Sequence, residues 1–155
     1  MLNKMKEFFN SLLEEEQTNT TADHNLAITA LLCEVCNADH DMSDVEQTVI
    51  TKTLSKLLNV DTKQAQALLE MGKQKISESN SLFDFTTQLR ALDFSTRSQL
   101  VTAMWEVAYA DNYLDPIEEH VIRKVSDLIY VNHSEFIRTK LAVVDALPDG
   151  VSPAC

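Results

Sequence analysis

The sequence predicts an all-α fold, on the evidence of its turn residues, its apolar spacing and an internal repeat. Glycine occurs only twice in the 155 residues and proline three times, whereas average usage would give about ten glycines. Hairpin-rich β folds need many residues that adopt positive φ or form tight turns, so this composition argues against them. Apolar residues recur at intervals of three and four along nearly the whole chain, as in helices that bury one face. We therefore expect a bundle of about seven or eight helices.

The first element is predicted as a separate amphipathic helix over residues 1–17. The polar run Thr18–Thr21 is expected to interrupt it, and Asp23 to cap a second helix that buries residues as far as Val35. We expect the first helix either to fold back on the rest of the domain or to dock on another protein. Its apolar face is formed by residues at i, i+3, i+4, i+7 and i+8, namely Met5, Phe8, Phe9, Leu12 and Leu13.

Two capping boxes predict the next helix starts. Ser43 and Glu46 form an S-x-x-E pattern that opens a helix through Leu58. Asp61 and Gln64 make a similar start to a helix that runs to about residue 78. A shorter helix is expected over 82–92.

The C-terminal third contains three further predicted helix starts. Ser95 is expected to open a helix that contains Trp105. Asp115 followed by Pro116 and Glu118 gives an N-cap, a first-turn proline and a capping glutamate. Asn132 and Glu135 start the last helix, and the change to Pro, Gly, Ser and Asp predicts a flexible tail over 145–155.

An internal repeat relates the two halves of the chain. Residues 31–52 align with 103–124 at an offset of 72 positions, so that repeat 1 covers about 23–79 and repeat 2 about 95–144. One copy alone would leave an apolar face uncovered, so we expect the two to pack around one core in a pseudo-two-fold arrangement. The identities are Glu34/Glu106, Val35/Val107, Ala38/Ala110, Asp39/Asp111, Glu46/Glu118, Val49/Val121, Ile50/Ile122 and Lys52/Lys124.

Three segments of the second repeat resemble a known family. Glu106–Asp111, Leu114–Glu118 and His133–Leu141 are similar to the TerB family of tellurite-resistance-associated proteins, whose relatives include the N-terminal domain of the DjlA co-chaperone. The resemblance covers roughly residues 22–144 and implies the duplicated TerB-like all-α fold in a bacterial cytoplasmic protein. It implies no settled activity. The chain departs from the family pattern after each loop aspartate, where His40 and Asn112 replace glycine.

Charge and cysteine content limit the partners and the compartment. Thirteen Lys and Arg against 24 Asp and Glu give a net charge of −11, which repels nucleic acid and anionic membranes. Cations and basic proteins are the natural partners, and another protein is the expected one. No apolar run approaches the ~20 residues that span a bilayer. Three cysteines without a signal sequence favour a reducing compartment, so we expect a cytoplasmic protein.

Two acidic loops are candidate sites for a divalent cation. Hard cations such as Ca²⁺ and Mg²⁺ bind several converging carboxylate oxygens, which short loops can supply. The loops are not EF-hands, because the glycine and the final glutamate of that motif are missing. Helix capping is the competing interpretation, since acids at a helix N-terminus suit the macrodipole. The candidate ligands are Asp39, Asp41, Glu46, Asp111, Asp115 and Glu118.

Other polar residues give no convincing catalytic arrangement. Cys33 and Cys36, with His40 following, have a zinc-like or redox-like spacing, but the repeat aligns them with apolar core positions and predicts buried thiols. Glu34 and Glu106 correspond through the repeat and would be the acids of any catalytic pair; loop bonding or solvent exposure is the simpler interpretation. We therefore expect a non-enzymatic interaction or sensing module with an acidic surface, linked to tellurite or stress resistance. A divalent-cation-binding protein is the alternative.

Overall fold

The chain is all-α over the residues that the structure, a computed structural model, describes: 2–37, 43–78, 83–110 and 114–147. These ranges contain seven helices, in agreement with the predicted class and number. The helices are α1 (Leu2–Asn37), α2 (Asp44–Leu58), α3 (Thr62–Glu78), α4 (Phe83–Leu89), α5 (Phe94–Ala108), α6 (Pro116–Leu128) and α7 (His133–Asp145).

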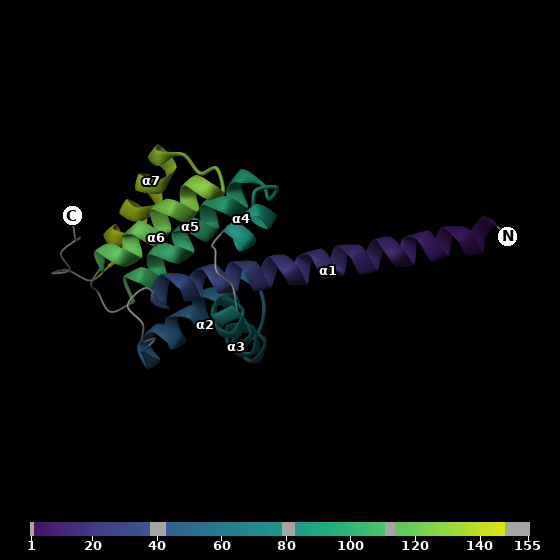
Figure 1. The fold of residues 1–155 in the computed structure, drawn as a ribbon, viewed down its shortest axis with the longest axis horizontal. Coiled ribbons are helices and arrows are strands. Elements are labelled where there is room, and N and C mark those ends of the chain that lie inside the picture. Colours follow the sequence, from purple (N-terminus) through teal and green to yellow (C-terminus); the bar gives the residue numbers. More distant parts are fainter. Residues whose placement is uncertain (1, 38–42, 79–82, 111–113, 148–155) are drawn as a thin grey trace.

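The bundle is assembled around the C-terminal half of α1 and the whole of α5. Helix α1 packs against α3, α4 and α5, while α5 also packs against α7, α2 and α6 (Figure 1). The largest side chains buried in this core include Trp105, Leu31, Leu32 and Phe136. These contacts bury the apolar faces that the periodicity predicted. The two-fold relation between the repeats stays a prediction.

Helix α1 continues without interruption from Leu2 to Asn37. The predicted break at Thr18–Thr21 and the predicted cap at Asp23 are therefore wrong. Threonine and asparagine cost at most about 0.7 kcal/mol per residue in a helix, and neither glycine nor proline occurs in this stretch to end it. Because helix growth is cooperative, a helix continues through such a polar run when the residues on both sides of it are helical.

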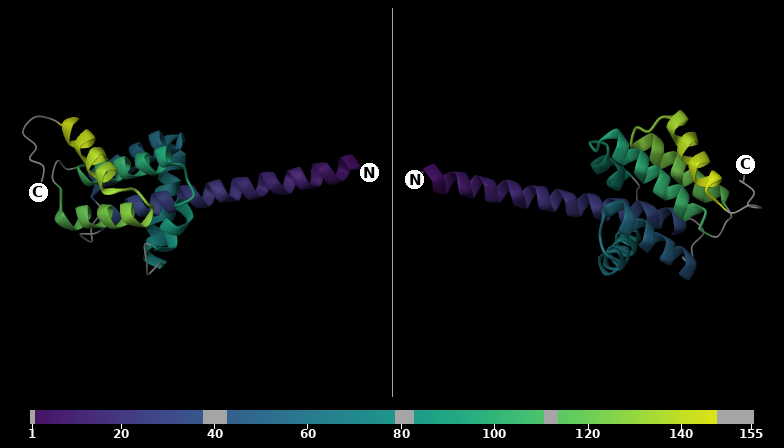
Figure 2. Two further views of the ribbon diagram at one scale, coloured as in Figure 1. Left: turned by 90° about the horizontal axis from the view of Figure 1, so that it is seen from above. Right: turned by 180° about the vertical axis from the view of Figure 1, so that it is seen from behind.

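The N-terminal half of α1 projects away from the bundle instead of folding back on it. All three views show it extending away from the other helices (Figures 1 and 2). The described side chains of this half, Lys4–Glu7 and Thr21–Asp23, are exposed, and those from Ala27 onward are buried except for Glu34. Of the two expectations for this segment, the one in which it folds back on the domain is thus incorrect.

The predicted capping residues of α2, α3 and α7 are confirmed. The Glu46 N–H donates to Ser43 Oγ at 3.2 Å, and the Glu135 N–H donates to Asn132 Oδ1 at 2.9 Å. At α3 the box is reciprocal, since the Gln64 N–H donates to Asp61 Oδ1 at 2.7 Å and the Asp61 N–H to Gln64 Oε1 at 3.1 Å. These starts are predictable because each depends on residues three positions apart.

Helix α5 begins earlier than predicted. Its N-cap is Asp93, whose Oδ1 accepts the N–H of Thr96 at 2.7 Å, so Ser95 lies inside the first turn. The bond with Thr96 also lowers the pKa of the Asp93 carboxyl. Either residue satisfies the local cap pattern, and the turn that follows α4 decides between them. Helix α4 ends at Leu89, three residues before its predicted end.

Two arginines fasten the C-terminal end of α6 to the elements before it. Arg90 Nε donates to the carbonyl of Leu128 at 2.8 Å, and Arg97 Nη1 donates to those of Ile129 at 3.0 Å and Tyr130 at 3.1 Å. Tyr130 has a φ of 63°, a left-handed conformation that an L-residue rarely adopts. The guanidinium of Arg90 lies 4.9 Å from the centre of the Tyr130 ring, so the same arginine supports this strained residue.

A side-chain cluster joins α7 to α5. Ser98 and Arg138 both bond the carboxylate of Glu135, and Arg138 Nε donates to its two oxygens at 3.0 and 2.9 Å. These bonds, first that of Arg138 and then that of Ser98, lower the pKa of Glu135 to about 2. The cluster therefore favours the charged carboxylate in the folded protein.

Helix α3 approaches α1 closely at Gly72, the buried glycine of the bundle. A Cβ at this position would lie 2.7 Å from Thr29 Cγ2 and 3.4 Å from Cys33 Sγ. Thr29 cannot easily move, because it is fully buried and its hydroxyl donates to the Asn25 carbonyl at 2.7 Å. The absence of a side chain at residue 72 thus sets how closely α1 and α3 pack.

Replacing Gly72 with Ala should destabilise the protein by about 1–3 kcal/mol through overpacking, less the ~1 kcal/mol that alanine gains over glycine inside a helix. Thr29→Ser removes the clashing methyl group and keeps the hydroxyl, so the double variant should recover most of the loss. Urea unfolding of both single variants and the double variant measures the coupling. Equal losses for Gly72→Ala with threonine or serine at position 29 would contradict this account.

The Glu135 cluster predicts a loss of stability in acid. A carboxyl whose pKa is lowered by folding stabilises the protein above its unfolded pKa of about 4.3. That contribution disappears as the pH falls from there toward 2, where the folded carboxyl is protonated. Glu135→Gln lacks it at every pH, so the stability difference between the two proteins should shrink over this interval. A difference that stays constant from pH 6 to pH 2 would be evidence against the cluster.

Candidate functional site

The starts of α2 and α6, which follow the two acidic loops, both lie near the C-terminal end of α1. Cys36, near the end of α1, interacts electrostatically with both Glu46 in the first turn of α2 and Glu118 in the first turn of α6. We call this region the acidic end and define it by five carboxylates of the first turns and caps of α2 and α6. They are Asp44, Glu46, Asp115, Glu118 and Glu119.

The two carboxylate oxygens of Glu46 differ in their hydrogen bonds to the described residues. Its Oε1 accepts the hydroxyl of Ser43 at 3.1 Å. Its Oε2 is buried and has no well-formed hydrogen bond within the described part of the chain, although the Cys36 thiol interacts with this carboxylate as a weak donor. A buried carboxylate oxygen normally has a donor or a cation beside it, because leaving it unsatisfied costs free energy. This oxygen is a chemically distinctive feature of the acidic end.

On the α6 side of the acidic end, more of the carboxylates have hydrogen-bond or ion-pair partners. Asp115 caps α6 by accepting the Ile117 N–H at 2.8 Å, which confirms the capping role predicted for it. Glu118 is only 8% exposed. Glu119 pairs with Lys140 at 3.2 Å and with Arg123 at 3.8 Å. Asp115 therefore serves the helix and Glu119 is paired, which leaves Glu46 as the described acid of this end with a buried oxygen that lacks a well-formed hydrogen bond.

Some of the six candidate metal ligands lie within the described residues, and the others lie outside them. Asp39, Asp41 and Asp111 lie outside the described residues. Within residues 2–37, 43–78, 83–110 and 114–147, no group of three or more His, Cys, Asp or Glu side chains is placed to hold a metal ion. The described carboxylates alone therefore do not form a complete cation site, and the six-residue ligand set stays a prediction.

Two buried aromatic residues, one in α5 and one at its C-cap, have polar atoms without hydrogen-bond partners among the described residues. Trp105 Nε1 and Tyr109 Oη are buried and make no hydrogen bond to the described residues. Burial, followed by the charge of Glu119, raises the pKa of the Tyr109 hydroxyl. Lys140 Nζ lies 5.5 Å from the centre of the Trp105 ring. Sequence periodicity assigned Trp105 to the core correctly, but it gives no signal for an unsatisfied polar atom.

The cysteine pair belongs to the hydrophobic core, as predicted. Cys33 is 0% and Cys36 1% exposed. Burial raises the pKa of Cys33 to about 12, and burial with the charges of Glu46 and Glu118 raises the pKa of Cys36. Both thiols therefore stay protonated near neutral pH, where a zinc ligand or a redox nucleophile needs the thiolate.

The two glutamates considered as a catalytic pair lie in different surroundings. Glu34 is half-buried on α1, and this burial raises the pKa of its carboxyl. Glu106 lines a cavity of about 520 Å³ between α2, α5 and α7, with Lys52 and Lys56 among its neighbours there. No hydrogen bond joins the two carboxylates in the described structure. The structure therefore does not assemble them into one acid–base unit.

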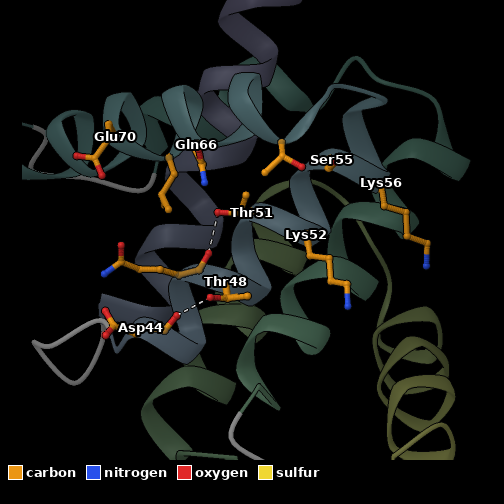
Figure 3. Close-up of a pocket in the computed structure, with 11 residues that line it drawn as sticks. Asp44, Thr48, Thr51, Lys52, Ser55, Lys56, Gln66 and Glu70 are labelled. Atoms are coloured by element: carbon orange, nitrogen blue, oxygen red, sulfur yellow. Dashed lines mark hydrogen bonds between the residues drawn. The ribbon is translucent and has the colours of Figure 1, made fainter.

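A larger cavity, of about 870 Å³, lies between α2 and α3 (Figure 3). Two of its hydroxyl groups bond their own helix, since Thr48 donates to the Asp44 carbonyl at 2.9 Å and Thr51 to that of Gln47 at 2.8 Å. Figure 3 shows the ammonium groups of Lys52 and Lys56 extending away from α3. Sequence analysis did not identify this cavity, because its lining residues come from the polar faces of two helices.

Comparison with known proteins identifies one family. The family model described as "Tellurite resistance protein TerB" matches residues 25–141. Neither the curated proteins nor the solved structures include a significant match to the chain. No helix in the described part of the chain is long and apolar enough to cross a membrane.

Proposed function

The chain belongs to the TerB family of tellurite-resistance-associated proteins, and from that premise we propose that it is a non-enzymatic interaction module. Its acidic end would bind a basic segment of another protein in a tellurite or stress response. The observation that carries this proposal is that α2 and α6 both pack on α1 and place the carboxylates of their first turns near Cys36, at the end of that helix.

The electrostatics of the acidic end suit such a partner. Asp44 and Glu46 form no ion pair within the described residues, and the chain as a whole carries a net charge of −11. A concentrated negative surface attracts basic segments from a distance, and this attraction weakens with added salt. The predicted loop acids Asp39, Asp41 and Asp111 adjoin the same helices in sequence and would add to this charge.

A synthetic lysine-rich peptide tests the proposal. Binding should shift amide NMR signals around residues 44–46 and 115–119 and should weaken as salt is added. Replacing Asp39, Asp41 and Asp111 with Asn should reduce the affinity by about tenfold, because it removes three charges that adjoin the acidic end in the sequence. The matched control replaces Glu70 and Glu78 with Gln and Asp127 with Asn, which removes the same charge from exposed positions on α3 and α6.

Equal weakening by both triple variants would contradict the proposal, because it would mean that the peptide responds to net charge and has no preferred surface. Shifts spread over the whole bundle would have the same meaning. Turnover of a substrate by the purified protein would contradict the non-enzymatic part of the proposal.

A divalent cation is the second candidate ligand, favoured by the buried Oε2 of Glu46, which lacks a well-formed hydrogen bond to the described residues. With the predicted loop ligands, this oxygen and the Glu118 carboxylate would supply the hard oxygen donors that Ca²⁺ or Mg²⁺ prefers. The cation would then link the two acidic loops and neutralise part of their charge.

An amide NMR titration with Ca²⁺, Mg²⁺, Mn²⁺ and Zn²⁺ tests the cation hypothesis. We expect saturable shifts confined to residues 39–46 and 111–118 at sub-millimolar cation. Asp39→Asn with Asp111→Asn should weaken binding by about tenfold or more while circular dichroism shows the same helix content, because each carboxylate contributes charge and ligand oxygens. Unchanged affinity in that double variant would exclude these loops as the cation site.

A further inference from the structure

The space between α2, α5 and α7 has the composition of a small-molecule site. Helices α2 and α7 both pack on α5, and the cavity of about 520 Å³ lies between them. A second cavity of about 320 Å³ shares four of its lining residues, so we treat the two as one and call it the α2–α5 hollow. Ligand sites in proteins have volumes of about 300 to 1,000 Å³. The shared residues are Thr53, Lys56, Thr102 and Glu106.

Much of the lining of the hollow is apolar. All three helices contribute aliphatic side chains, and the residue that lies two positions after α7 contributes another. Sites for small molecules typically combine such a lining with a few polar groups that fix the orientation of the ligand. The hollow can therefore hold the apolar part of a ligand. The apolar lining includes Val49, Leu57, Ala103, Val143 and Leu147.

Thr53 supplies the hollow with a hydroxyl group that has no hydrogen-bond partner among the described residues. Threonine hydroxyls inside helices commonly donate to the carbonyl four residues earlier, as those of Thr51 at 2.8 Å and Thr102 at 3.0 Å do. Thr53 makes no such bond, although the residue is only 7% exposed. Leaving a nearly buried hydroxyl unbonded costs free energy, which a ligand in the hollow would recover. The alignment of the repeats pairs Thr53 with Val125, so packing by itself does not call for a hydroxyl.

Two lysines and one glutamate are the charged residues of the hollow. Lys52 and Lys56 are four residues apart on α2, so their side chains leave the same face of this helix. Both extend away from α3 and thus toward the side of α2 on which the hollow lies (Figure 3). Neither lysine forms an ion pair with Glu106 or with any other described residue. Two positive charges and one negative charge are neutralised by a ligand that carries a single negative charge.

We propose that the α2–α5 hollow binds a small aliphatic monocarboxylate. The carboxylate interacts with Lys52 and Lys56 and accepts a hydrogen bond from the Thr53 hydroxyl, and the aliphatic chain packs on the apolar lining. Glu106 disfavours a second negative charge on the ligand, and the two lysines disfavour a cation. Since these residues lie outside the acidic end, the ligand is additional to the partner proposed above.

Isothermal titration calorimetry of the full chain with octanoate tests the proposal. We expect saturable binding of one octanoate per chain with a dissociation constant below about 1 mM. Hexanoate should bind about tenfold more weakly, because each methylene that is buried contributes about fourfold. Suberate, a dianion with the same number of carbon atoms, should bind at least about tenfold more weakly as well. Octylamine has the same chain with the opposite charge and should leave the amide NMR signals of residues 49–57 unchanged.

Charge variants locate the carboxylate of the ligand. Lys52→Gln with Lys56→Gln should raise the dissociation constant for octanoate by about tenfold or more. The matched control, Lys63→Gln with Lys75→Gln, removes the same charge from exposed positions on α3 and should leave the constant within about twofold. Glu106→Gln should lower the constant by about threefold, because it removes the charge that repels the carboxylate.

Thr53→Val separates ligand binding from packing. Because the hydroxyl has no partner among the described residues, valine should keep the free energy of unfolding in urea at or above the wild-type value. It should nevertheless raise the dissociation constant for octanoate by about tenfold, since a hydrogen bond to a charged group is lost. Thr53→Ser keeps the hydroxyl and should bind within about threefold of the wild-type chain.

Three outcomes would overturn the proposal. The first is the absence of saturable octanoate binding. The second is equal weakening by the two lysine pairs, which would mean that the ligand responds to net charge alone. The third is a set of octanoate-induced amide NMR shifts that lie outside α2, α5 and α7. None of these bears on the acidic end, because the peptide assay for that surface uses no variant in the hollow.

Discussion

The burial of the C-terminal half of α1 on nearly all sides is the constraint on which the rest of the structure depends. From Ala27 to Cys36 every residue except Glu34 is at most 4% exposed. A helix that is apolar around its whole circumference must be surrounded, and α3, α4 and α5 supply the cover. Close approach on one side requires the missing side chain at Gly72. The other helices are arranged by the need to cover this segment.

The same burial determines the chemistry open to the molecule. The thiols of Cys33 and Cys36 lie on the central helix, so desolvation keeps them protonated and unreactive. Carboxylates cannot be buried there without a large cost and therefore collect where α1 ends and α2 and α6 begin. Acids in first turns also complement the helix dipoles, so the charge of the acidic end has a structural role and remains available for binding. In the function that we propose, the same carboxylates stabilise the helices and bind the partner.

The N-terminal half of α1 is the part of this helix that the covering helices do not reach. Within one continuous helix, the half inside the bundle is stabilised by packing and the half outside is not. The polar run between the halves marks this change of environment, although it does not break the helix.

By itself, the sequence determined the all-α class, the family, most helix starts and the burial of the cysteines. These depend on composition, on apolar spacing and on caps such as Ser43, Asp61 and Asn132, all of which act over a few residues. Local sequence rules did not predict that α1 continues through Thr18–Thr21, because cooperative helix growth outweighs the low helix propensity of these residues. The choice of Asp93 over Ser95 as a cap depended likewise on how the preceding turn packs. Only the tertiary structure brought Glu46 and Glu118 to Cys36 and left Glu46 Oε2 without a well-formed hydrogen bond to the described residues, because contacts between helices far apart in the chain are decided by which faces bury each other.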